Sequence, residues 1–207
     1  MNHTWNKVIY KIWSPFYDSF FNSGLFLKAR KQVLSDIPFK EGQKVLFVGV
    51  GTGADLELIE STKIDITAID FSPDMLNKAE LKFANSSITF IQMDALNMDF
   101  VENSFDIVVG SLILSVVPNP DACFSEMKRV LKRDGKVILF DKFAPETKQL
   151  SLPKKIIRPI VKLLGTDIGL KFESIYMHHK EQVQIILDQP VMLNGMYRKI
   201  ILKKKAN

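Results

Sequence analysis

Short apolar runs alternate with amphipathic segments between residues 44 and 142, and this alternation restricts the fold more than any other feature of the chain. The runs are rich in β-branched and aromatic residues, as buried strands are: KVLFVGV, IDITAID, SITFIQM, FDIVVGS and KVILFDK. The segments between them have helical spacing: ADLELIEST, SPDMLNKAELKFA and PDACFSEMKRVLKRDG. Such alternation is typical of βαβ units, so we predict an α/β fold with a parallel sheet and helices on both faces.

The chain after residue 144 departs from this alternation. PKKIIRPIVKLLG predicts a basic amphipathic helix, kinked at Pro159, within an insertion at about residues 145–172. ESIYMHHKEQVQIIL predicts a further helix. The last segment, PVMLNGMYRKIILKKK, predicts a closing hairpin around Asn194 and Gly195.

The chain has 207 residues, which fits one domain with a small addition. The first 40 residues are rich in aromatics and helical in pattern, so we expect an N-terminal helical cap over residues 1–40 and a main domain over 41–207. The one cysteine, Cys123, cannot form an intramolecular disulfide, which favours a cytoplasmic protein. We find neither a signal-peptide pattern nor an apolar run near the ~18 residues of a membrane span.

Three glycines follow the first predicted strand, in the sequence VLFVGVGTGADLELI: Gly49, Gly51 and Gly53. A backbone without side chains at the end of a buried strand lets amide groups face a ligand. The glycines also satisfy the loose G-x-G-x-x-A pattern of dinucleotide sites. A tight turn between a closely packed strand and helix would need them too, so the motif alone leaves both readings open.

Carboxylates follow the next two predicted strands. Asp70 ends ITAID, 17 residues after Gly53, where a carboxylate can accept both hydroxyl hydrogens of a ribose. Its alternative role is that of an acid at the start of the helix that Ser72 and Pro73 open. Asp94 follows FIQM, where it can accept the exocyclic amine of an adenine or cap a turn.

The combined pattern resembles class I S-adenosylmethionine-dependent methyltransferases. The matching segments are VLFVGVGTG, ITAIDFSPDML, FIQMDAL, FDIVVGSLILSVVPNPDACFSEMKRVLKRDGKVILFD and the terminal hairpin, which cover most of residues 43–205. The resemblance implies a Rossmann-like sheet of seven strands in the order 3-2-1-4-5-7-6, with strand 7 antiparallel. It also implies S-adenosyl-L-methionine as methyl donor and S-adenosyl-L-homocysteine as product.

The positions that correspond to the family's donor contacts are Gly49, Gly51, Gly53, Asp70, Phe71, Met75, Asp94, Ala95, Gly110 and Ser111. By this resemblance, the three loop glycines would line the methionine and ribose side of the donor. Asp70 would hold the ribose hydroxyls. Gly110 and Ser111, at the end of the fourth strand, would flank the methionine part near the sulfonium.

The resemblance places the adenine between two segments. Phe71 and Met75 would pack on the ring, and Asp94, with the backbone of Ala95, would meet its edge. One position departs from the family pattern, because Phe47 stands where members usually carry an acid that organises the ligand's amino end.

Two residues could replace that acid. Asp55 could take its place or could be an ordinary first-turn helix acid. Tyr17 is the other, because related enzymes carry a similar aromatic-Tyr-Asp stretch that closes over the ligand. Ordinary helix packing explains most aromatics of this region equally well.

The chemistry of methyl transfer requires few residues. A sulfonium is already a strong methyl donor, so the enzyme must align a nucleophile and exclude water. A base is needed only if the acceptor must lose a proton. Asp141, at the end of VILFD, and Tyr17 are the catalytic candidates, although Asp141 could simply pair with Lys142. No metal site is expected.

The acceptor is narrowed by a second resemblance. DKFAPE, LLGTDIG and NGMYRKI resemble segments of bacterial phosphatidylethanolamine N-methyltransferases and their relatives. The aromatic N-terminus and PKKIIRPIVKLL could lie on an anionic membrane surface, or the basic helix could be a solvated face over the sheet. The alternatives are a soluble or quinone-like acceptor and a noncatalytic donor-binding domain.

Two other classes are disfavoured. GSLILSV lacks the Asn/Asp-Pro-Pro-aromatic box of base-amine methylation, and no basic stripe lines the predicted cleft, which argues against a nucleic-acid enzyme. Asp94 and the closing hairpin argue against a dehydrogenase. Oligomeric state is not predicted.

Overall fold

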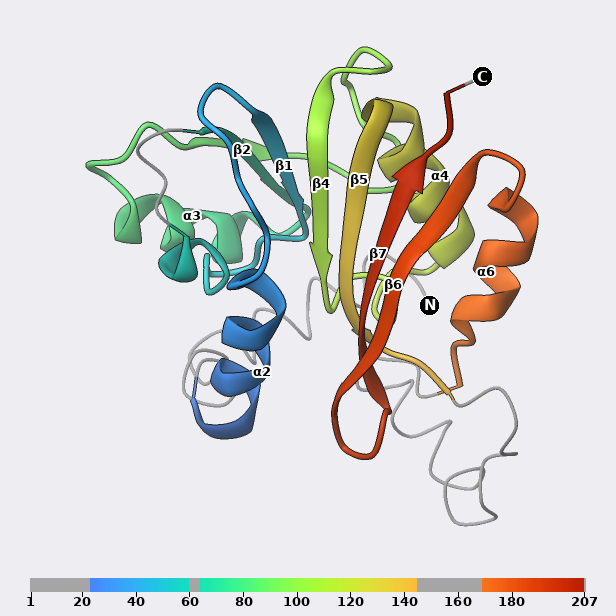
Figure 1. The fold of residues 1–207 in the computed structure, drawn as a ribbon. Coiled ribbons are helices and arrows are strands. Elements are labelled where there is room, and N and C mark those ends of the chain that lie inside the picture. The colour runs from blue at the N-terminus through green and yellow to red at the C-terminus, as the bar shows by residue number, and fades with distance from the viewer. Residues whose placement is uncertain (1–22, 60–63, 145–168, 207) are drawn as a thin grey trace.

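The computed structural model describes residues 23–59, 64–144 and 169–206. Seven strands form one sheet in the order β3-β2-β1-β4-β5-β7-β6 (Figure 1). The strands are β1 (Lys44–Val48), β2 (Asp65–Asp70), β3 (Thr89–Gln92), β4 (Phe105–Ser111), β5 (Leu131–Lys142), β6 (Val183–Met192) and β7 (Tyr197–Lys204). The helices are α2 (Gly24–Leu34), the short 3-10 helix η1 (Leu56–Leu58), α3 (Pro73–Lys82), α4 (Pro120–Val130) and α6 (Phe172–His179).

The strand directions confirm the sheet that the resemblance implied. Strands β1 to β5 run parallel, and β7 runs antiparallel to both of its neighbours, β5 and β6. The predicted hairpin joins β6 to β7, and its turn has left-handed backbone at Asn194 and Gly195 (φ 53° and 82°).

Both faces of the sheet are covered, as predicted. Successive strand residues point to opposite faces, so β1 contributes to two core clusters. Val48 belongs to the same core cluster as Phe124 of α4 and Ile175 of α6, two helices that lie on the same side of the sheet in Figure 1. Phe47 points the other way and belongs to a second cluster, which includes Val33 of α2. The position that usually holds an acid is therefore a core residue here, only 2% exposed.

Helix α3 begins where its sequence predicted. Pro73 occupies the first turn, and the Ser72 hydroxyl accepts the N–H of Met75 at 3.4 Å. Helix α4 begins in the same way, with the side-chain oxygen of Asn119 accepting the N–H of Ala122 at 3.1 Å. Each cap satisfies a backbone N–H in the first turn of its helix, which fixes where the helix begins.

The prediction of a helix through EQVQIIL was wrong, because α6 ends at His179 and β6 begins at Val183. Burial along β6 alternates, with Val183 buried and Gln184 and Ile186 exposed, which is the period of a strand. Pro190 lies on this strand without disrupting the sheet, because β6 is the edge of the sheet and needs no partner on its outer side.

The segment predicted as a helix after the glycine loop is much shorter than expected. Leu58 N–H donates to the carbonyl of Asp55 and Ile59 N–H to that of Leu56, at 3.1 and 3.3 Å, the i to i+3 pattern of a 3-10 turn. Ile59 is already extended, with φ −121° and ψ 133°. The turn is held by tertiary contact, because Asp55 and Leu56 are both buried.

A buried ion pair joins α2 to this turn. Arg30 Nη1 contacts Asp55 Oδ1, and the two side chains are only 5% and 9% exposed. Asp55 therefore faces α2, which accounts for its burial without a ligand role.

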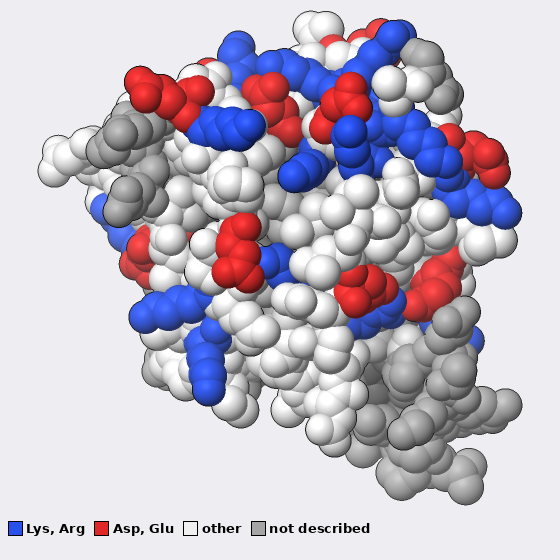
Figure 2. All heavy atoms as spheres, viewed as in Figure 1, with Lys and Arg blue, Asp and Glu red and all other residues white. Residues whose placement is uncertain are grey.

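Charged side chains gather at the end of the sheet opposite the carboxyl ends of the parallel strands. Figure 2 shows Lys and Arg along the upper edge of the molecule, interspersed with Asp and Glu. Two ion pairs lie at this end, Lys132–Asp106 at 2.9 Å and Lys203–Asp134 at 2.8 Å. Within the part of the chain that the structure describes, no helix is long and apolar enough to cross a membrane.

Candidate functional site

A pocket lies at the carboxyl ends of β1, β2, β3 and β4, the lower end of these strands in Figure 1. Its lining residues are Gly49, Gly51, Ile69, Asp70, Phe71, Ser72, Met75, Met93, Asp94, Ala95, Ser111, Leu112, Ile113, Val116, Val117 and Pro118. Eight of the positions predicted for the donor are among them: Gly49, Gly51, Asp70, Phe71, Met75, Asp94, Ala95 and Ser111. Lys and Arg are absent from this described lining.

The glycine loop provides the floor of the pocket. Gly49 and Gly51 have φ of 71° and 57°, a conformation that residues with a Cβ adopt rarely. A Cβ on Gly49 would lie 2.6 Å from Cδ1 of Ile113 on the opposite wall. Glycine at this position therefore lets Ile113 approach the loop backbone closely, and a larger residue would have to displace it.

Asp70 connects the glycine loop to the start of α3. Its Oδ2 accepts the N–H of Gly51 and its Oδ1 the N–H of Ser72, both at 2.8 Å. Burial raises the pKa of the Asp70 carboxyl, and these backbone donors oppose that effect only in part. Each carboxylate oxygen keeps a further lone pair, so the group can still accept hydroxyl hydrogens of a ligand.

Asp94 lies on the wall that follows β3. The N–H of Met93 donates to the carbonyl of Asp70 at 3.0 Å, which fixes this segment beside the end of β2. Asp94 Oδ1 accepts the N–H of Leu96 at 2.9 Å, so the carboxylate caps its own turn and also lines the pocket. The structure shows the turn-capping role, and the contact with an adenine amine remains a prediction for which Asp94 is in position.

Gly53 and Gly110 lie outside the set of lining residues, and the structure gives each a packing reason. A Cβ on Gly53 would lie 2.7 Å from the Phe83 ring that follows α3. A Cβ on Gly110 would lie 2.7 Å from Cε of Met127 in α4. Their predicted contacts with a donor remain predictions.

The wall opposite the glycine loop was missed by sequence reasoning. The loop after β4 contributes five apolar residues to it: Leu112, Ile113, Val116, Val117 and Pro118. The signal for it was present, since LILSVVP continues the apolar character of β4 beyond the length of a strand. Its residues could not be assigned to a pocket before the strand order was known.

Of the two catalytic candidates, the structure describes Asp141 alone. Asp141 is fully buried at the end of β5 and is not a lining residue. Its Oδ2 accepts the N–H of Ser115 at 3.2 Å and its Oδ1 that of Lys142 at 2.8 Å, and burial raises the pKa of this carboxyl. Asp141 thus holds the loop that forms the apolar wall. Tyr17 lies outside the described residues.

Comparison with known proteins identifies the family. A family model described as a methyltransferase domain matches residues 46–139. The chain is 32% identical over 160 residues to a phosphatidylethanolamine N-methyltransferase of Cereibacter sphaeroides, a match that covers 75% of this chain and 77% of the relative. The chain belongs to the class I S-adenosylmethionine-dependent methyltransferases.

Two further comparisons define how much the family membership implies. This methyltransferase is also 32% identical over 161 residues to a demethylmenaquinone methyltransferase of Staphylococcus haemolyticus, covering 75% of this chain and 64% of the relative. A chain from a complex that contains the Haloferax volcanii methyltransferase activator Trm112 superimposes with a TM-score of 0.78 at 14% identity, over 97% of this chain and 98% of that chain. The last match supports the fold alone.

The pocket of this methyltransferase fits S-adenosylmethionine, the methyl donor of the family. The pocket has a glycine floor that a Cβ would fill and two carboxylates, each after the end of a neighbouring strand. Phe71 and Met75 add apolar side chains to its lining. When bound, the donor supplies an activated methyl group. The protein would supply carboxylates that can accept hydroxyl and amine hydrogens and an apolar wall that limits access of water.

Gly49 offers a direct test of this fit. We expect Gly49→Ala to weaken adenosylmethionine binding at least ~10-fold, because its Cβ would push Ile113 into the pocket. Gly42→Ala is the matched control, since Gly42 has a similar φ of 77° but nothing within 4 Å of its Cβ. Thermal unfolding should show a similar loss of stability in both variants, because the backbone strain is similar. Calorimetric titration should show weaker binding of adenosylmethionine in Gly49→Ala alone. Equal affinities in the two variants would mean that Gly49 is not part of the site.

Proposed function

We propose that this methyltransferase transfers the methyl group of S-adenosylmethionine to the amine of a phosphatidylethanolamine-like lipid. In the proposed orientation the ribose hydroxyls donate to Asp70, the adenine packs on Phe71 and Met75, and its amine donates to Asp94. The methionine part lies by Gly49, Gly51 and Ser111. The acceptor approaches along the apolar wall formed by the loop after β4.

The observation that carries this choice of acceptor is the chemistry of the lining. Among the described lining residues, Asp70 and Asp94 are the ones that can act as bases, and the donor occupies both. A neutral amine attacks through its own lone pair, the bond from sulfur to methyl breaks with its electrons staying on sulfur, and the extra proton on nitrogen leaves to water. Such an acceptor needs no base in the pocket.

Two further features support a lipid. The relative from Cereibacter sphaeroides is a phosphatidylethanolamine N-methyltransferase, and it matches this chain over 160 residues. The segment PKKIIRPIVKLL, outside the described residues, has the basic amphipathic composition that binds anionic membrane surfaces.

A quinone-like acceptor is the second candidate. The demethylmenaquinone methyltransferase relative favours it, and the apolar wall suits a ring as well as a lipid. Methylation of a ring carbon requires removal of its proton, so this function needs a base beyond the described lining, for which Tyr17 and Asp141 are the candidates. A noncatalytic donor-binding domain remains the third reading, and Phe47 is the feature that suggests it.

Turnover on defined acceptors tests the proposal. The full chain is incubated with methyl-labelled adenosylmethionine and vesicles that contain phosphatidylethanolamine, an anionic lipid and a demethylated quinone. We expect mass spectrometry to find the label on the lipid amine. Charge reversal at Lys154, Lys155 and Arg158 should lower turnover on these vesicles but not on a short-chain soluble analogue.

Each alternative has its own signature in this assay. Label on the quinone alone would replace the lipid by the second candidate. Tight donor binding without label on any acceptor, in this mixture or in whole-cell extracts, would favour the noncatalytic reading.

A further inference from the structure

The loop between β3 and β4 carries Asp94 into the pocket, and its first residues form one compact turn. The N–H of Leu96 donates to Asp94 Oδ1 at 2.9 Å, and the N–H of Asn97 donates to the Asp94 carbonyl at 3.1 Å. Met98 follows directly and is only 4% exposed. Because the turn is closed by short bonds, a displacement of Met98 displaces Asp94 as well.

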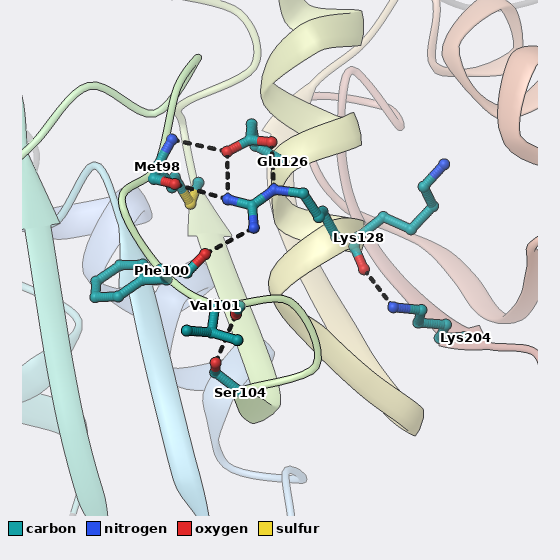
Figure 3. A network of polar contacts seen from close by, with 8 residues as sticks. Met98, Phe100, Val101, Ser104, Glu126, Lys128 and Lys204 are labelled. Atoms are coloured by element: carbon teal, nitrogen blue, oxygen red, sulfur yellow. Dashed lines mark hydrogen bonds and ion pairs between the residues drawn. The ribbon is translucent and has the colours of Figure 1, made fainter.

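Two side chains of α4 hold the backbone at this point (Figure 3). Glu126 Oε2 accepts the N–H of Met98 at 2.7 Å. Arg129 donates from Nη2 to the Met98 carbonyl at 2.6 Å and from Nη1 to the Phe100 carbonyl at 2.7 Å. The Glu126 carboxylate and the Arg129 guanidinium therefore hold the loop backbone by hydrogen bonds at Met98 and Phe100.

Glu126 and Arg129 also bind each other in a fork-to-fork arrangement. Arg129 Nε donates to Oε1 at 2.7 Å and Nη2 donates to Oε2 at 2.8 Å. They are three residues apart on α4, so they share one face of the helix, and the side chains of Arg129 and Glu126 are 34% and 17% exposed, respectively. Hydrogen bonds from Arg129 hold the pKa of Glu126 below its usual value. Neither residue lines the pocket.

We propose that Glu126 and Arg129 are positioning residues for recognition of the donor's adenine. They keep the Met98–Phe100 backbone in place, and so keep the Asp94 carboxylate where it accepts the exocyclic amine. The inference rests on the proposed donor orientation, in which Asp94 meets the adenine edge.

The rest of the loop is anchored independently, so the effect of losing Arg129 is local. The N–H of Asn103 donates to the Arg129 carbonyl at 3.1 Å and that of Ser104 to the Val130 carbonyl at 2.8 Å, bonds that do not involve the Arg129 side chain. The ring of Phe100 also packs edge-on against Phe105, with centroids 5.1 Å apart. Loss of the guanidinium would remove the two side-chain bonds to the Met98 and Phe100 carbonyls, and so loosen the turn that carries Asp94, and would leave the far end of the loop attached.

The test compares two ligands that differ at the exocyclic group of the base, which Asp94 contacts in the proposed orientation. S-adenosylhomocysteine has the exocyclic amine, and S-inosylhomocysteine has a carbonyl there, which cannot donate. For Arg129→Met in the full chain, we expect calorimetry to show about 10-fold weaker binding of the adenosyl ligand, ~1.4 kcal/mol, and a change of less than about 2-fold for the inosyl ligand. The ratio of the two affinities, which general destabilisation does not alter, should therefore fall.

Matched variants complete the design. Arg129→Lys should recover part of the ratio, because an ammonium can still donate to one carbonyl. Lys132→Met is the control, since Lys132 pairs with Asp106 at similar exposure (40%) and does not contact the loop. If Arg129→Met does not fold, Glu126→Gln, which keeps one acceptor oxygen, should lower the ratio in the same direction by a smaller factor.

Asp94→Ala distinguishes a wrong donor orientation from a wrong positioning role. It should remove the discrimination between the ligands. If it leaves the ratio unchanged, the donor orientation is wrong and the positioning role falls with it. If Asp94→Ala abolishes the preference for the adenosyl ligand while Arg129→Met and Glu126→Gln leave the affinity ratio unchanged, the positioning role alone is overturned.

Discussion

Asp70→Ala should raise the Kd for adenosylmethionine by about 100-fold to 1000-fold. In the proposed orientation the carboxylate accepts two charge-assisted hydrogen bonds from ribose hydroxyls, each worth about 1.5–3 kcal/mol. In the variant, water that hydrogen-bonds to these hydroxyls offsets part of the lost binding free energy. It also orients the glycine loop through the Gly51 N–H and the start of α3 through the Ser72 N–H. Calorimetric titration of the purified full chain measures this change.

Asp65→Ala is the matched control for this variant. Asp65 lies on the same strand at the opposite end and is exposed. It should bind the donor as the unchanged protein does. A nicotinamide dinucleotide should not bind either protein, and clean binding of that compound with none of adenosylmethionine would overturn the assignment of the pocket.

The charge state of Asp70 should give donor binding by the unchanged protein a pH dependence. Burial raises its pKa above the ordinary value of 3.8, and donated hydroxyl hydrogens favour the ionised carboxylate. Donor affinity should therefore be full above the raised pKa and should fall as pH decreases through it, while Asp70→Asn should lack this dependence. Circular dichroism at each pH distinguishes loss of affinity from loss of fold. A dependence that persists in Asp70→Asn belongs to another group.

Arg30→Ala should lower the free energy of unfolding by about 3–5 kcal/mol. Removing the guanidinium leaves the Asp55 carboxylate with its charge in the interior, where its side chain is only 9% exposed. The pair joins α2 to the turn after the glycine loop, so the loss should also loosen the contact between α2 and the sheet. Chemical denaturation followed by circular dichroism measures the effect.

Two comparisons isolate the cost of the unpaired charge. The double variant Arg30→Met, Asp55→Leu removes both charges and should regain most of the stability, because apolar pairs of similar volume replace buried ion pairs at little cost. Lys132→Ala breaks a pair whose side chains are 40% and 29% exposed, and should cost at most ~1 kcal/mol. A double variant as unstable as Arg30→Ala would mean that the Arg30 side chain acts through packing instead.

Several features of the fold and site could be predicted because they follow from residues close together in the chain. The strand runs and their alternation with helices predicted the α/β architecture, and Ser72-Pro73 predicted the start of α3. Gly49, Gly51, Asp70 and Asp94 were identified because each lies at or just after the end of a predicted strand. The order of the strands came from the resemblance and not from the periodicity.

Local pattern and tertiary context disagree at two places. Val183–Leu187 has enough apolar residues to continue a helix, but pairing with β7 makes it an edge strand. Asp141 ends a strand that points toward the pocket, but the N–H of Ser115 draws its carboxylate into the interior beneath the apolar wall. In both cases the deciding partner is distant in the sequence.

The sequence by itself determined the class of sheet, the bare glycine loop and the acids beyond the next two strands, because the period of a strand and the position of its end are local properties. Only the tertiary structure decided which of these residues share a pocket and what holds them there. The Arg30–Asp55 pair joins residues 25 positions apart, and Arg129 reaches back 31 positions to Met98. Such contacts depend on how the sheet brings distant segments together, and that arrangement leaves no mark in the local pattern.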